Sequence, residues 1–309
     1  MRRSSHDPIA MDIEFRIQCA DTLPGIRELN YRHAFHAGNF ADVHKHLVLL
    51  AVLARLTRKP TPLFFLDTHA GRGMYDLHSD DAARGNEWRE GVGRLHGITP
   101  VSADLASYLR IAVTTSEKTT RQFRQYAGSP LLALAALRDT DRAVFVEQQP
   151  MEARALEKVL PRRRGLAVID GDGYGALKAY LPPKENRGLV LIDPPYEVED
   201  EFARVENALK FGLQRWPNGV FAVWYPIKAG GESRRFHASL QQSGLRKLLL
   251  LDFNLRPADS PLGLNGSGML IANPPWQLDV AMRESLDELL RLLSADGTGS
   301  VRIEWLVGE

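Results

Sequence analysis

Two segments of the chain share a short motif, an apolar run followed by Asp or Asn, two prolines and an aromatic residue. The first is LVLIDPPY at 189–196, and the second is LIANPPW at 270–276. A carboxylate or amide at the first motif position can accept N–H bonds from an exocyclic amine and stabilise the charge that develops when its nitrogen attacks. The prolines fix the backbone, and the aromatic ring can stack on a base, a contact worth about 1–3 kcal/mol. The motif therefore predicts chemistry on the amine of a base.

Other acidic residues follow predicted strands in the same way. They are Asp67, with His69 and Gly71 in the turn after the strand 63–67, Glu147 after the strand in 143–150, and the pair Asp172-Gly173 after the strand that starts at 166. Because ligands of an open α/β sheet bind beyond the carboxyl ends of its strands, these residues are expected to line one site. Carboxylates accept hydrogen bonds from a ribose diol or an ammonium group, so the series predicts a pocket for an adenosine-type ligand. The turn lacks the G-x-G-x-x-G spacing of a dinucleotide site, and the chain contains no P-loop sequence.

Apolar strands alternate with helices along most of the chain. Strands are predicted at 63–67, in 143–150, from 166, and at 188–196, 219–226, 245–255, 268–276 and 300–306, and helices from Asn39 to Pro60 and at 103–124, 151–160 and 279–293. A further helix is expected to begin with Ser129 as its N-cap and Pro130 in its first turn. Continuous apolar strands in this alternation indicate a mostly parallel sheet covered by helices on both faces. The predicted fold class is α/β, doubly wound and Rossmann-like.

The two copies of the motif differ in their predicted place in this sheet. Glu147, Asp172 and Asp193 are one strand–helix unit apart, which puts Asp193 at the fourth strand, next to the first strand and its glycine turn. Asn273 follows after two further strands, at the end of the next one, and is expected in a hairpin at the far side of the sheet. Asp193 is therefore the predicted catalytic residue. Trp224, near the end of the strand 219–226, is expected to serve packing.

Composition and charge restrict the kinds of function and cellular setting that fit the chain. The 309 residues include 39 Lys and Arg and 38 Asp and Glu, with a net charge of +1, so any nucleic-acid contact must rest on local patches. Arginines gather at 84–94, 121–124 and 162–164, although each cluster also fits an ordinary solvated face. The single cysteine, Cys19, excludes an internal disulfide and favours a reducing, cytoplasmic setting. The longest apolar stretch, 47–56, is too short to span a membrane, and the histidines at 33–46 lack the further ligands that a metal site needs.

The ordered acids and the DPPY strand resemble the class I S-adenosylmethionine-dependent methyltransferases that act on exocyclic amines. The blocks YRHAFHAGNFADVHKH, LDTHAGRG, AGSPLL, WYPIK and SGMLIANPPW carry the likeness from Asn30 to Glu309, and they resemble the bacterial ribosomal RNA large-subunit methyltransferase J family. The resemblance implies S-adenosyl-L-methionine as cofactor, 23S ribosomal RNA as partner, and N6 of one adenine as the methyl acceptor. It also implies a seven-stranded sheet and, between the first two strands, a helical insertion at about 74–128 that forms part of the RNA surface. We expect a cytoplasmic monomer.

The resemblance further implies roles for individual residues. Asp193 would act in catalysis with Pro194 and Tyr196, and Tyr31 would contact the RNA. The cofactor pocket would include His46, His69, Ser129, Glu147, Asp172 and Gly173, to which the strand-end pattern adds Asp67 and Gly71. Family members usually begin close to the YRHAFHAGN block. Residues 1–29 are therefore an N-terminal extension, genuine or due to an upstream start codon, before a methyltransferase domain at 30–309.

Three other functions use some of the same features. DNA adenine-N6 or cytosine-N4 methyltransferases have the same tetrapeptide, and methyltransferases of protein glutamine typically have Asn-Pro-Pro-Tyr. A non-catalytic RNA-binding assembly factor could keep the fold alone. Such a factor would have no need of all four strand-end acids, Asp67, Glu147, Asp172 and Asp193.

Overall fold

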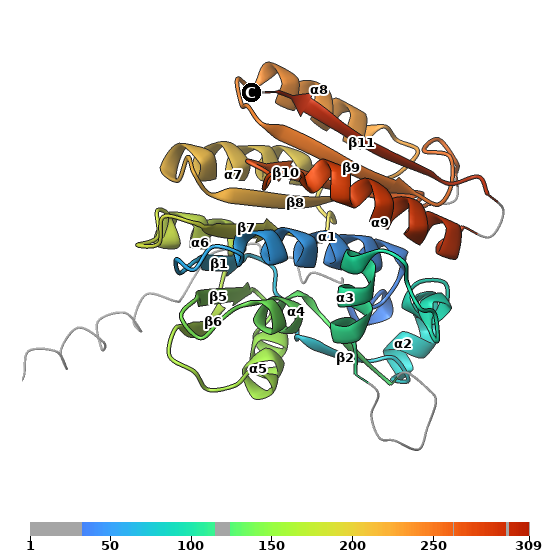
Figure 1. Cartoon of the computed structure of the whole chain (residues 1–309), viewed down its shortest axis with the longest axis horizontal. Coiled ribbons are helices and arrows are strands. Elements are labelled where there is room, and N and C mark those ends of the chain that lie inside the picture. The colour runs from blue at the N-terminus through green and yellow to red at the C-terminus, as the bar shows by residue number, and fades with distance from the viewer. Residues whose placement is uncertain (1–32, 115–123, 262, 295–296, 309) are drawn as a thin grey trace, which may run out of the picture. The chain divides into compact units, whose positions relative to one another are not determined.

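Eight strands form the central sheet (Figure 1), one more than the predicted seven. The computed structural model describes residues 33–114, 124–261, 263–294 and 297–308, so the predicted extension 1–29 and Tyr31 lie outside the described residues. The strands lie in the order β11 (Ser300–Val307), β9 (Leu248–Asn254), β10 (Gly266–Ala272), β8 (Val220–Ile227), β7 (Gly188–Ile192), β1 (Phe64–Asp67), β5 (Arg142–Glu147) and β6 (Leu166–Asp170). The count of seven came from the family resemblance, whereas the apolar runs also predicted a strand at 300–306; this strand is β11, which pairs with β9 at the edge of the sheet.

The strands from β6 to β8 run parallel, and β10 is antiparallel to both of its neighbours. Strands β1 and β7 are buried at every position, as is expected of parallel strands covered on both sides. Successive residues point to opposite faces, so Phe65 joins one hydrophobic core while Phe64 and Leu66 join the other. The predicted α/β class with a mostly parallel sheet is confirmed.

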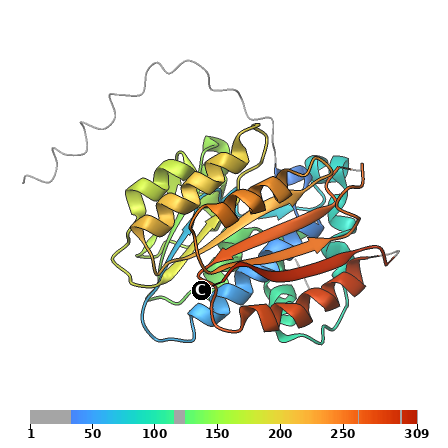
Figure 2. The same ribbon diagram turned by 90° about the horizontal axis from the view of Figure 1, so that it is seen from above.

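Helices cover both faces of the sheet (Figure 2). One core contains side chains of α1 (Phe40–Leu56), α4 (Ser129–Ala136), α5 (Pro150–Val159) and α9 (Leu278–Leu293). The opposite core contains side chains of α6 (Gly173–Tyr180), α7 (Glu201–Arg215) and α8 (Glu232–Gln242). In the described residues, no helix is long and apolar enough to cross a membrane.

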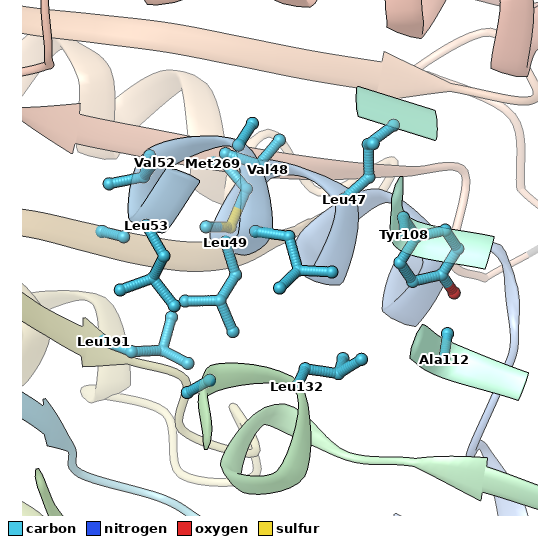
Figure 3. Packing of buried hydrophobic residues seen from close by; sticks show 14 of the residues in the cluster. Leu47, Val48, Leu49, Val52, Leu53, Tyr108, Ala112, Leu132, Leu191 and Met269 are labelled. Atoms are coloured by element: carbon cyan, nitrogen blue, oxygen red, sulfur yellow. The ribbon is translucent and has the colours of Figure 1, made fainter. Parts of the chain in front are cut away.

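Helix α1 is buried on almost every side. Its residues from Ala41 to Leu53 are all buried, and Figure 3 shows Leu49 and Leu53 among side chains from the sheet, α3 and α4. A helix that is apolar around its whole circumference is stable only inside a core. Asn39 caps its start as predicted, because Oδ1 accepts the N–H groups of Ala41 and Asp42. The helix ends at Leu56, before the predicted Pro60.

The segment between β1 and β5 contains strands as well as the predicted helices. Its elements are β2 (Met74–Asp76), α2 (Asp80–Gly85), the 3-10 turns Glu87–Arg89 and Val92–Leu95, α3 (Ala103–Ala112), β3 (Val113–Thr114) and β4 (Gln125–Ala127), with β2, β4 and β3 in one small sheet. The helix predicted at 103–124 ends at Ala112, where the β-branched residues Val113 and Thr114 favour a strand. The predicted N-cap of α4 is also wrong, since Gly128 occupies that position.

Candidate active site

The strand-end acids lie at one edge of the sheet. Asp67 ends β1 and is level with residues of β5 and β7, and Glu147 ends β5 level with Asp170 of β6. Asp172 and Asp193 follow the ends of β6 and β7. Because these strands are parallel, their carboxyl ends meet at the same edge, so the structure brings the predicted residues together.

Asp193 forms an ion pair with Lys45, which reaches the site from α1. Lys45 Nζ lies 2.5 Å from Asp193 Oδ2 and 2.8 Å from Asp42 Oδ1. The Lys45 side chain is 5% exposed and that of Asp193 is 12% exposed. Burial disfavours the Lys45 ammonium, but Asp193 and Asp42 outweigh burial and hold the pKa of Lys45 above its ordinary value. Lys45 is therefore a buried cation shared by two carboxylates.

Asp42 organises the other side of this ion pair. It accepts a hydrogen bond from the Gly38 amide at 3.0 Å, and its Oδ2 lies 2.9 Å from His33 Nε2. Burial opposes ionisation of Asp42, yet His33 and Lys45 hold its pKa well below the ordinary range. Sequence analysis missed Asp42 and Lys45. The sequence feature that could have revealed them is an Asp and a Lys three residues apart inside a mostly apolar helix. A buried charged pair of this kind needs a further partner from elsewhere in the fold.

The titration of Asp193 is set by burial and by Lys45. Burial raises the pKa of Asp193, and Lys45 acts in the opposite direction. Asp67 lies deeper, and burial raises its pKa to about 7 against the effect of the hydrogen bond from Ser129. The two carboxyl groups thus differ in their partners: Asp193 faces an ammonium, while Asp67 accepts a hydroxyl.

The aromatic residue of the DPPY motif is held by its neighbours. Tyr196 has a left-handed backbone with φ of 52°, and its hydroxyl donates to the carbonyl of Trp224 at 2.8 Å. Its ring lies 4.7 Å from that of Phe202 and 5.6 Å from that of Trp224, measured between centroids. Trp224 also has the Lys45 ammonium 5.6 Å from its ring centroid. Trp224, predicted only to pack, therefore lies beside the two charged groups.

Hydrogen bonds connect the predicted pocket residues around the glycine turn. Asp67 accepts the Ser129 hydroxyl at 2.7 Å and the His69 amide at 3.2 Å. Glu147 accepts the Gly71 amide at 2.8 Å through one oxygen and the Gln149 amide at 2.7 Å through the other. Ser129, the first residue of α4, thus uses its hydroxyl proton to hold Asp67.

Asp172 and Gly173 lie where the carboxyl end of β6 leads into the first turn of α6. Asp172 caps α6 by accepting the amides of Tyr174 and Gly175. A Cβ on Gly173 would lie 2.1 Å from the carbonyl oxygen of Thr68. Only glycine therefore lets α6 approach the turn after β1.

The two predicted pocket histidines have different surroundings. His69 Nδ1 lies 2.8 Å from the hydroxyl of Thr68, and burial lowers the pKa of His69 to about 4. His46 Nδ1 lies 2.7 Å from the hydroxyl of Tyr126 in β4, and burial lowers its pKa to about 3. Both side chains are therefore neutral near pH 7. In the described residues, no group of His, Cys, Asp and Glu is arranged to hold a metal ion.

The second Pro-Pro motif lies at the opposite edge. Strand β10 runs antiparallel to β8, so Asn273 follows the end that points away from Asp193. Its Nδ2 donates to the carbonyls of Pro217 and Gly219 at 2.8 and 2.9 Å. The predicted hairpin is present, since β10 pairs antiparallel with β9, but β10 lies inside the sheet next to β8 and not at its far side. Strand direction, and not distance across the sheet, separates the two copies.

Known proteins resemble this chain along almost its whole length. The family model described as ribosomal RNA large subunit methyltransferase D, RlmJ, matches residues 60–307. The chain belongs to this family. Proteins named ribosomal RNA large subunit methyltransferase J from Haemophilus influenzae and Escherichia coli are 40% and 37% identical to it, over 91% of this chain and 100% of each relative. The crystal structure of protein LPL1258 from Legionella pneumophila has a TM-score of 0.79 at 33% identity, and the match covers 87% of this chain and 98% of that one.

Family membership confirms two predictions made from the sequence. The protein is an S-adenosylmethionine-dependent methyltransferase with a class I fold, and its family is the one that the YRHAFHAGN and DPPY blocks indicate. The family does not by itself assign roles to residues, so the roles depend on the geometry of the site.

Proposed function

We propose that this protein transfers a methyl group from S-adenosylmethionine to N6 of an adenine in 23S ribosomal RNA. The observation that carries the proposal is the position of Asp193. It stands at the carboxyl edge of the sheet beside the glycine turn, with a buried ammonium at one of its oxygens. The names of the relatives favour large-subunit ribosomal RNA as the substrate. We infer that the protein acts in the cytoplasm, as a monomer with its methyltransferase domain at 30–309.

The residues around the glycine turn fit the cofactor. Each oxygen of Glu147 accepts one backbone amide and keeps a lone pair for a hydroxyl of a ribose diol. The remaining proposed pocket residues are His46, Asp67, His69, Gly71, Ser129, Asp172 and Gly173. When bound, S-adenosylmethionine supplies an electrophilic methyl group on a sulfonium sulfur.

Asp193 prepares the acceptor amine. Lys45 occupies Oδ2 of Asp193, which leaves Oδ1 to accept one N–H of the adenine amine, and the backbone carbonyl of Pro194 accepts the other. Both acceptors stabilise the positive charge that develops on the nitrogen. Lys45 counteracts the effect of burial on the pKa of Asp193 and so favours its ionised form, and Asp42 balances the charge of Lys45 while Asp193 binds the amine.

Tyr196 provides the surface for the base. Its ring is fixed by Phe202, by Trp224 and by the hydroxyl bond to the Trp224 carbonyl, so little conformational entropy is lost when a flipped adenine stacks on it. We assign Tyr31 to RNA contact on the basis of the resemblance alone.

The buried charges also weigh against a non-catalytic assembly factor. Burying Asp42, Lys45 and Asp193 together costs several kcal/mol in desolvation, which their mutual attraction only partly repays. A binding module gains nothing from that arrangement. DNA methyltransferases use the same tetrapeptide, so this alternative differs from the proposed function in its substrate, and an assay with both RNA and DNA distinguishes the two.

The direct test is methylation with labelled S-adenosylmethionine of three substrates: protein-free large-subunit RNA, assembled large subunits, and duplex DNA. Label recovered as N6-methyladenosine from ribosomal RNA is the expected result, and the comparison of the first two substrates identifies the preferred form. Labelling of DNA without RNA would replace the proposed substrate. Absence of cofactor binding by isothermal titration would overturn the enzymatic proposal as a whole.

A further inference from the structure

The loops beyond β8 and β9 lie at the same edge of the sheet as Asp193. Ile192 of β7 is level with Val223 of β8, so Trp224 is level with Asp193, and Lys228 lies four residues further along. At 3.3 Å per residue, Lys228 is roughly 13 Å beyond Asp193 in the direction that strands β7 and β8 point. This loop therefore borders the space in front of the site.

Two segments distant in sequence meet at this border. The Ile227 carbonyl accepts the amide of Asn265 at 2.9 Å, and the Asn265 carbonyl accepts the amide of Arg256 at 3.2 Å. Arg256 and Lys228 are thus linked through one hydrogen-bonded junction. Arg234 reaches the same region, because its Nη2 would lie 3.0 Å from a Cβ on Gly231 in the loop after β8.

Three cations lie at this border, Lys228 and Arg256 in the loops and Arg234 in the first turn of α8. Lys228, Arg234 and Arg256 are all exposed, and none of them forms an ion pair with a carboxylate of the described residues. The guanidinium of Arg256 donates to the Leu264 carbonyl at 3.3 Å. The same border carries two acids: Glu232 at the start of α8, which lies 3.4 Å from Arg235, and the exposed Asp259 in the loop after β9. The border therefore has a local excess of positive charge.

The insertion predicted to contact RNA has no such excess in its described residues. Segments 74–114 and 124–128 contain five arginines and six carboxylates. Arg94 pairs with Glu90, and Arg124 lies 3.4 Å from Asp76. Its charge does not favour a polyanion over other partners.

We propose that Lys228, Arg234 and Arg256 form a phosphate-binding surface for the RNA backbone next to the target adenine. The inference rests on the proposed function and specifies which part of the protein holds that substrate. Flipping a base out of a helix costs a few kcal/mol, and contacts to the neighbouring phosphates supply binding free energy to offset it. The surface lies on the β8 and β9 side of Asp193. The loop just after the DPPY motif carries exposed Glu197, Glu199 and Asp200 and would repel phosphates.

The test is the triple variant Lys228→Gln/Arg234→Gln/Arg256→Gln, with Lys158→Gln/Arg162→Gln/Arg164→Gln as the matched control. The control removes one lysine and two arginines that are also exposed, from α5 and the loop before β6, which lead to the opposite edge of the sheet. Binding of a fluorescently labelled RNA stem-loop is measured by anisotropy at several salt concentrations, and methylation of protein-free large-subunit RNA is measured in parallel.

The triple variant of Lys228, Arg234 and Arg256 is expected to bind RNA at least tenfold more weakly than the unaltered protein. The plot of the logarithm of the association constant against the logarithm of the salt concentration should become less steep by about 2–3, since each phosphate contact contributes roughly 0.7–0.9 to the magnitude of its slope. KM for RNA should rise in parallel, while kcat and the affinity for S-adenosylmethionine stay within twofold. An unchanged salt slope, or an equal loss in the control, would overturn the surface assignment. If the unaltered protein binds RNA through this surface but methylates no RNA, the proposed function fails and the surface stands.

Discussion

The DPPY and NPPW motifs end two strands that are separated by only one other strand, yet they lie at opposite edges of the sheet. Asp193 follows parallel β7 and meets a buried lysine, whereas Asn273 follows antiparallel β10 and donates to two loop carbonyls. Each motif has one residue in the left-handed region, but it is Tyr196 in the first copy and Asn273 in the second. The tetrapeptide therefore produces a turn in both places. The direction of the strand decides which turn faces the ligand pocket.

The largest expected effect is that of removing the carboxylate. Asp193→Ala should lower kcat by about 10²–10³, because an acceptor aimed at a developing charge contributes that much. Affinity for S-adenosylmethionine, measured by isothermal titration, should change less than twofold. If Asn273→Ala instead abolished methyl transfer while Asp193→Ala did not, the functional ranking of the two motifs would be reversed.

Lys45→Met tests the charged partner that the second motif lacks. Lys45 holds the pKa of Asp193 down against burial, so its removal raises that pKa and moves the acid limb of the kcat/KM profile to higher pH. Activity at pH 7 should fall by about tenfold or more. Asp42→Asn removes a neighbouring negative charge that raises the pKa of Asp193, so its acid limb should move to lower pH. Shifts in the same direction for the two variants would contradict this account.

Removal of a buried ionic partner also costs stability, on the order of 3–5 kcal/mol. The pH profiles of both variants are therefore recorded below their unfolding temperatures, with the folded fraction checked by circular dichroism. A purely structural role would lower the unfolding temperature without moving the acid limb.

The aromatic residues of the two motifs, Tyr196 and Trp276, should also differ in their contribution to RNA binding. Tyr196→Ala should raise KM for RNA by about 5–150-fold, the equivalent of one stacking contact of 1–3 kcal/mol. Trp276 is 85% exposed at the opposite edge, so Trp276→Ala should leave kcat and KM unchanged. Steady-state kinetics with large-subunit RNA measure both. Equal effects would mean that the second motif also contacts the substrate.

The smallest expected effect belongs to Asn273. Asn273→Ala removes hydrogen bonds to the carbonyls of Pro217 and Gly219 and should lower the free energy of unfolding by about 1–2 kcal/mol. Chemical denaturation measures the change, and methylation should be retained. A loss of activity without a loss of stability would contradict the structural role.

Patterns along the chain predicted the residues at strand ends but not the contacts made across the fold. Asp67, Glu147 and Asp193 could be placed at one edge because parallel strands put their carboxyl ends together. Lys45 could not be placed, since its contact with Asp193 joins residues 148 apart and depends on how α1 crosses the sheet. The predicted hairpin implied the antiparallel direction of β10, but its position between β9 and β8 could not be predicted, because an apolar run suits an inner strand as well as an outer one. Ser129 fits the N-cap pattern, yet α4 already includes it as its first residue after the cap Gly128, and its hydroxyl donates to Asp67, a contact across the fold that no local pattern shows.

The complete burial of α1 has a consequence for how the chain folds during synthesis. His44 Nδ1 lies 2.8 Å from Ser267 Oγ, 223 residues later in the chain. At about 5–20 residues per second, α1 waits roughly 10–45 s for β10 to be made. During that time its apolar surface lacks the strand that covers it, and exposed surface of this kind makes a nascent chain prone to aggregation. The ion pair between Lys45 and Asp193, which lies 148 residues later, likewise forms only after β7 has been made.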